Sequence, residues 1–167
     1  TLTKTTLGNL LVSANTLADI GEDSSIGRGI ATNDTTNAES LVFSGLGAEL
    51  RYIGNILNGN LTLGSTSAST NRLFTVSGSA ATLSNTASNN NAIVWSNPGP
   101  ILHGSNANRT LTLGGTVAAD NTFNPQWTNS TGFISSLTKT GTGQWNLGNT
   151  NNTYTGLTTV ANGILAL

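Results

Sequence analysis

The chain has 167 residues, a formal net charge of −1 and only 8% charged residues. This length fits one domain, and the singly scattered cations form no basic patch, so nucleic acid is not an expected partner. Cys is absent, which excludes disulfides and thiolate metal sites. No apolar run approaches the roughly 18 residues of a membrane helix, so direct membrane insertion is not expected either.

More than half of the chain is neutral and small: it has 28 Thr, 23 Asn, 20 Gly and 17 Ser residues. Such polarity with low charge often signals disorder. Here, however, the 36% of hydrophobic residues lie in short alternating clusters. That pattern is sufficient for a thin continuous core and predicts an all-β fold.

The alternation predicts short strands throughout, at 41–43, 50–53, 73–76, 81–83, 92–95 and 133–137, with further strands near 145–147, 157 and 164–167. Almost every connection contains Gly, Asn or Ser, which favour turns. No segment is a capped helix: Leu10–Ile20 is the nearest, but Gly21 follows it. Pro98 and Pro100 predict a loop or edge excursion over 96–103.

Internal echoes indicate a repeat architecture. The sequence Asn-Leu-Thr-Leu-Gly at 60–64 recurs as Thr-Leu-Thr-Leu-Gly at 110–114, and Leu-Thr-Lys-Thr at 2–5 recurs at 137–140. In both of the latter copies a Gly follows at the same offset, at Gly8 and Gly143. Both ends of the chain therefore carry related strand-turn-strand units.

Residues 137–167 closely resemble the autotransporter-associated β-strand repeat of bacterial surface proteins, and residues 2–16 resemble a degraded copy. The resemblance implies a right-handed, single-stranded parallel β-helix spanning 1–167 as one domain. It also implies a location that is extracellular or on the bacterial outer cell surface, within a larger protein that is anchored elsewhere. The family shares a stalk rather than a chemistry, so the resemblance brings no catalytic residues and no cofactor.

A β-helix also accounts for the pattern physically. Coils of about 20–25 residues, stacked at roughly 4.8 Å, would give roughly seven coils with aliphatic ladders inside and Thr and Asn outside. A β-sandwich is the alternative, because many short strands suit that fold as well.

Catalysis is not expected. Glycoside hydrolysis needs two facing carboxylates, whereas the seven acids lie in turn-like contexts: Asp19, Glu22, Asp23, Asp34, Glu39, Glu49 and Asp120. His103 is the single histidine, and the chain has no Gly-x-Ser-x-Gly elbow and no zinc-ligand set. A structural or adhesive role is therefore predicted. A polysaccharide-binding or polysaccharide-degrading β-helix is the alternative.

Trp127 is the candidate ligand contact, because it lies in a polar stretch from which an indole could stack on a sugar ring. Surface glycans and other cell-surface proteins are the partners to which this hypothesis points. Packing of Trp127 against a coil edge is the competing interpretation.

The chain itself is a further candidate partner. It ends in an uncapped apolar strand at 163–167 and begins within a related repeat, so Ile164, Leu165 and Leu167 could stack on a coil containing Leu2 of another copy. Head-to-tail contacts of this kind propagate into filaments.

Overall fold

The computed structural model describes residues 2–4, 9–14, 41–45, 47–55, 67–87 and 90–167; for 2–4, 9–14 and 54–55 it describes the backbone alone. Within this part the regular structure is entirely β, in short strands joined by turns and loops. None of the described residues forms a helix long and apolar enough to cross a membrane.

The strands form three sheets. The first contains β1 (Leu2–Lys4), β3 (Leu41–Phe43), β6 (Thr75–Val76) and β9 (Leu102–His103). The second contains β2 (Asn9–Ala14), β4 (Ala48–Asn55), β7 (Ala80–Asn85), β10 (Arg109–Gly115), β12 (Ser135–Lys139) and β14 (Thr158–Val160). The third contains β5 (Ala68–Thr70), β8 (Ile93–Trp95), β11 (Asn121–Phe123), β13 (Gln144–Leu147) and β15 (Ile164–Ala166).

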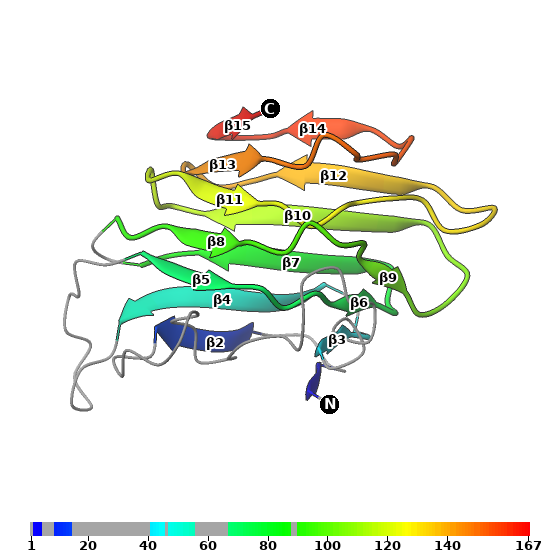
Figure 1. Ribbon diagram of the computed structural model, residues 1–167, viewed down its shortest axis with the longest axis horizontal. Helices are drawn as coiled ribbons and strands as arrows, with labels where there is room; N and C mark the ends of the chain where they lie inside the picture. The colour runs from blue at the N-terminus through cyan, green and yellow to red at the C-terminus, as the bar shows by residue number, and fades with distance from the viewer. Residues whose placement is uncertain (1, 5–8, 15–40, 46, 56–66, 88–89) are drawn as a thin grey trace.

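Every pairing within these sheets is parallel and joins a strand to its counterpart in the next turn of the chain. The chain thus coils upward through the sheets, as Figure 1 shows from the N-terminus to the C-terminus. This arrangement is a parallel β-helix, and it confirms the fold predicted from the sequence. The sandwich alternative is wrong, because sandwiches are built from antiparallel sheets.

The coils become shorter toward the C-terminus. In the second sheet Asn9 pairs with Glu49, 40 residues later, whereas Leu137 pairs with Thr158, 21 residues later. The predicted length of about 20–25 residues is therefore correct for the last coils and too short for the first. Within the described residues the second sheet has six strands, against the roughly seven coils expected.

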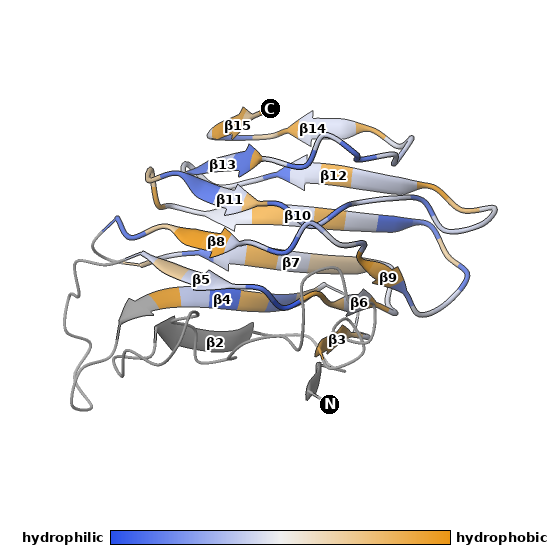
Figure 2. Cartoon of the chain, viewed as in Figure 1, coloured by the Kyte–Doolittle hydropathy of each residue, from blue (hydrophilic) through white to orange (hydrophobic). Residues whose placement is uncertain are grey.

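Alternation in the strands sends apolar side chains into a narrow core. One ladder in the second sheet runs Leu50, Leu83, Leu113, Lys139, Val160. A parallel ladder runs Ala48, Ala81, Leu111, Leu137, Thr158. The apolar positions recur along β7, β8 and β10 in Figure 2. In the third sheet Trp95, Phe123 and Leu147 stack, and Phe74 packs its edge against Trp95 with ring centroids 5.4 Å apart.

Many outward positions of the second sheet carry hydroxyl groups. Thr82, Thr112, Thr138 and Thr159 are neighbours in four consecutive strands. β-branched Thr fits this pleated face without carrying charge. The outer Thr ladder predicted from composition is therefore present.

Asparagine behaves differently from the prediction that it lies outside. Asn85 and Asn121 are fully buried, and Asn85 Nδ2 donates to Asn121 Oδ1 at 2.6 Å. Others bridge successive coils at the turns: Asn90 Oδ1 accepts the Ala118 and Ala119 amides, and Asn129 Oδ1 accepts those of Ser135 and Thr155. Many asparagines therefore satisfy backbone groups that turns leave unpaired.

Candidate functional site

The structure places Trp127 in the core, with none of its surface exposed. Its indole N–H donates to the Ser136 carbonyl oxygen at 3.1 Å, and its ring lies 5.3 Å from the His103 ring. A buried ring has no face left for a sugar, so the prediction of a ligand contact at Trp127 is wrong for this conformation. The competing interpretation, packing against a coil edge, is correct in that the ring packs against the protein, but the ring lies in the core.

His103 lies against this indole and is half-buried. Burial lowers its pKa, the nearby Arg109 guanidinium lowers it further, and an interaction with the Thr128 backbone raises it. Its Nδ1 atom is buried without a hydrogen-bond partner. The imidazole is thus held in an environment that favours the neutral form.

Arg109 is a buried cation that the sequence analysis did not identify. Only 2% of its surface is exposed, and its guanidinium donates to backbone oxygens of Val76 at 2.9 Å, of Ala107 at 2.8 Å and of Ser105. Burial lowers its pKa. Its position at the start of β10, in phase with Leu111 and Leu113, is the signal that could have shown that it points inward.

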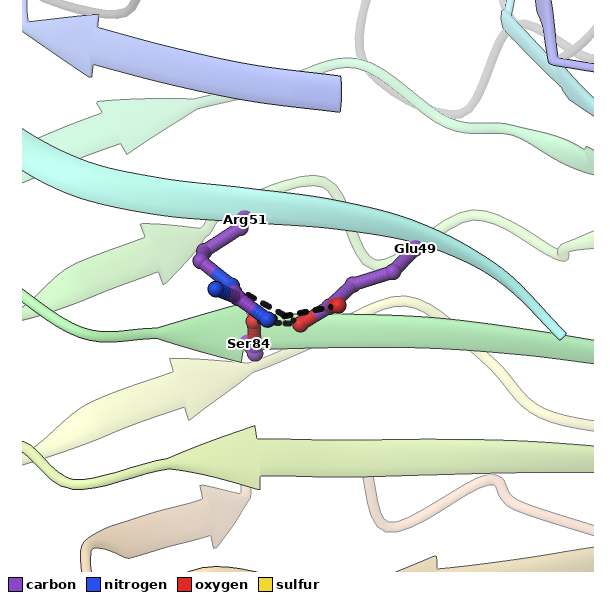
Figure 3. A network of polar contacts seen from close by, with 3 residues as sticks. All are labelled: Glu49, Arg51 and Ser84. Atoms are coloured by element: carbon purple, nitrogen blue, oxygen red, sulfur yellow. Dashed lines mark hydrogen bonds and ion pairs between the residues drawn. The ribbon is translucent and has the colours of Figure 1, made fainter. Parts of the chain in front are cut away.

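Of the seven candidate acids, Glu49 and Asp120 lie within the described residues. They lie in different sheets or beside different sheets, so they do not form a facing pair. Glu49, in the second sheet, pairs with Arg51 at 2.9 Å and accepts a hydrogen bond from Ser84 (Figure 3). Asp120 precedes a strand of the third sheet and accepts from Gln144 Nε2 at 2.5 Å. The remaining candidate acids lie outside the described residues: Asp19, Glu22, Asp23, Asp34 and Glu39.

Over the residues that the structure describes, no three His, Cys, Asp or Glu side chains gather into a potential metal site. The acids in that region are already hydrogen-bonded to neighbouring side chains.

The last coil presents the candidate contact residues at the C-terminal end. Leu167 is 96% exposed and Ile164 is 56% exposed, whereas Leu165 is half-buried against the core. Beside them lies a hollow of about 420 Å³. Its lining combines amides, hydroxyls and apolar groups: Leu147, Asn149, Thr150, Asn152, Tyr154, Gly156, Thr158 and Leu167.

The strands at the N-terminal end and those at the C-terminal end belong to different pairs of sheets. Leu2 lies in β1, at the edge of the first sheet, and its side chain is outside the described residues. The C-terminal edges are β14 and β15, in the second and third sheets. Of the three sheets, only the second therefore has an edge strand in both the first and the last described coils, namely β2 and β14.

Comparison with known proteins adds two findings. Residues 137–167 match the family model described as the passenger-associated-transport-repeat. The chain is also 35% identical over 141 residues to a protein named adhesin BmaC autotransporter, from Brucella suis biovar 1 (strain 1330). That alignment covers 84% of this chain but only 4% of the relative's length. No solved structure matches the chain significantly.

The matched segment runs from within β12 through β15, so it comprises a complete coil with its two corner turns and the strands on either side. The chain is therefore a parallel β-helix whose C-terminal residues 137–167 are similar to the passenger-associated-transport-repeat.

Proposed function

We propose that this chain is a non-catalytic segment of an adhesive passenger that is displayed outside a bacterial cell, where it serves as part of a stalk. The observation that carries the proposal is the similarity to an adhesin autotransporter along 84% of the chain, combined with a passenger-associated repeat that forms an integral coil of the β-helix. The alignment covers only 4% of the relative's length, so adhesion by the protein that contains this chain is part of what we propose.

The described surface supports a stalk. Its outer ladder of threonines is neutral, its buried cations are bonded to backbone oxygens, and Glu49 and Asp120 are held by neighbouring side chains. A rigid stack of coils held by main-chain hydrogen bonds suits a spacer that must hold a contact surface away from the cell.

Surface display and adhesion are tested separately. Antibodies raised against this chain should label intact cells of the source bacterium, and external protease should remove the signal. The purified chain, added in excess, should reduce attachment of those cells to host cells or matrix. Absence of labelling on intact cells would contradict the location, and release of reducing sugars from polysaccharides by the chain would contradict a non-catalytic role.

Self-association is a narrower proposal about partners. The edges of β14 and β15 have no strand beyond them within the described residues, and Leu167 is almost fully exposed beside them. Exposed strand edges invite pairing with another chain. The shared second sheet would place β14 of one copy against β2 of the next.

Sedimentation and electron microscopy test this contact. Filaments or concentration-dependent oligomers should form, and Leu167→Lys should weaken them by placing a charge at the contact. The Val94→Lys variant, on the outer face of β8, serves as the matched control. A chain that remains monomeric across a wide concentration range would contradict the proposal.

A further inference from the structure

One of the inward ladders of the second sheet contains a charged residue. Lys139 follows Leu50, Leu83 and Leu113 in that ladder and precedes Val160. None of its surface is exposed. An isolated ammonium in such a position loses its hydration, so the protein must supply replacement partners.

Those partners are three carbonyl oxygens at the corner where two coils turn. Lys139 Nζ donates to Thr140 O at 2.5 Å, to Gly141 O at 2.8 Å and to Asn162 O at 3.2 Å. A lysine ammonium has three N–H donors, so the cage satisfies each of them once. Two of the oxygens belong to the coil of Lys139 and the third belongs to the next coil.

Two glycines with positive φ lie at this corner, and one of them contacts the cage. Gly141 and Gly163 have φ values of 69° and 74°, in the region that side chains disfavour. A Cβ atom on Gly163 would lie 2.3 Å from Gly143 O, 2.5 Å from Gly141 O and 2.8 Å from Lys139 Nζ. Glycine at position 163 therefore lets the last coil approach both the backbone of the preceding coil and the ammonium.

No carboxylate accounts for the buried charge. The one ion pair within the described part of the chain is Glu49 with Arg51, and burial is the cause of the lowered pKa of Lys139. The hydrogen-bond acceptors of the ammonium are therefore backbone carbonyl oxygens, whose dipoles stabilise the positive charge.

We propose that this corner is a cation site built from the carbonyl oxygens of Thr140, Gly141 and Asn162, which the chain fills with its own Lys139 ammonium. The bound cation ties the coil that contains Lys139 to the next coil, and both partners lie within residues 137–167. When the side chain is shortened, the cage takes a free primary ammonium in its place.

Chemical rescue tests the site. Lys139→Ala should lower the thermal midpoint of unfolding, and propylammonium should restore it in a saturable manner, because it replaces the deleted atoms and the charge. Propan-1-ol has the same size without the charge and should not restore it. The wild-type chain and Leu113→Ala, in the same ladder, should not respond specifically to the amine.

A second variant decides the question if Lys139→Ala does not fold. The chain has no Cys, so Lys139→Cys can be alkylated in denaturant at a single position and refolded. An aminoethyl group restores an ammonium at the length of lysine, whereas a propyl group keeps the length and removes the charge. The aminoethyl form should refold with the wild-type midpoint and the propyl form should not.

Equal behaviour of the aminoethyl and propyl forms would overturn the proposal, because the side chain would then act by packing alone. Equal responses to propylammonium and propan-1-ol, or no response of a folded Lys139→Ala chain to either, would overturn it as well.

Discussion

Replacing Asn121 by Ala should destabilise the β-helix more than a change at any outward position of the same strand. The Asn121 amide is fully buried and connects three consecutive coils. Its Oδ1 accepts from Asn85 Nδ2 at 2.6 Å and from the Ile93 amide at 3.0 Å, and its Nδ2 donates to Gln144 O at 2.8 Å and Val117 O at 3.3 Å.

The expected loss of stability follows from the buried donors that lose an acceptor when the Asn121 side chain is truncated. The Ile93 amide loses its side-chain acceptor, and the Asn85 amide keeps only the bond to Asn91 O. Each buried donor left unsatisfied costs about 1–3 kcal/mol. With weaker losses at the two carbonyls, we expect the free energy of unfolding to fall by about 3–5 kcal/mol.

Denaturant unfolding followed by far-ultraviolet circular dichroism and tryptophan fluorescence measures this difference. Thr122→Ala is the matched control, because Thr122 is the next residue of β11, its side chain points to the opposite face, and its hydroxyl donates only to Asp120 O. Its effect should stay within about 0.5 kcal/mol. A loss below about 1 kcal/mol for Asn121→Ala, or equal losses for both variants, would refute the reasoning.

Two further predictions concern glycine and histidine. Gly115→Ala should unfold or severely destabilise the chain, because its φ is 107° and the new Cβ would lie 1.9 Å from Asn85 O; Gly132→Ala, with φ of 78° and open space around it, should cost only about 1 kcal/mol of backbone strain. Similar melting temperatures for the two variants would contradict the steric argument. The pKa of His103 is lowered by burial and by Arg109, so protonation is disfavoured in the folded state and stability should fall as the pH decreases below 6.5. His103→Gln should lose this part of the acid dependence in thermal melts at a series of pH values, and an unchanged pH profile would argue against it.

Strands whose apolar residues alternate could be predicted from the sequence, and those without such alternation could not. The Leu-Val-Phe pattern of β3 and the Gln-Trp-Asn-Leu pattern of β13 place their inward residues unambiguously. In β5, by contrast, the sequence is Ala-Ser-Thr, and in β11 it is Asn-Thr-Phe. These strands exist because their neighbours in the sheet supply a ladder of partners, which is information that a local pattern does not contain.

The exposure of the candidate site residue could not be predicted from its local sequence either. The polar residues around Trp127 predict a ligand contact, yet the polar side chains near it accept hydrogen bonds from backbone amides of the turns. Asn152 Oδ1 accepts the Trp127 amide, and Asn129 accepts two amides of neighbouring segments. In this chain a polar neighbourhood marks a coil corner rather than an exposed surface, so polarity is a poor guide to exposure.

Buried polar groups therefore carry a large share of the specificity of this fold. Two leucine ladders can be stacked in several registers at similar hydrophobic gain, whereas Asn121 and Lys139 bond to particular groups of the adjacent coils. For Asn121 these are Asn85 Nδ2, the Ile93 amide and the Gln144 carbonyl oxygen, and for Lys139 the Asn162 carbonyl oxygen. A slipped register would separate these partners. A stack assembled in this way tolerates wide variation of its outer residues, and that freedom suits the stalk that we propose, whose shape must persist while its exterior changes.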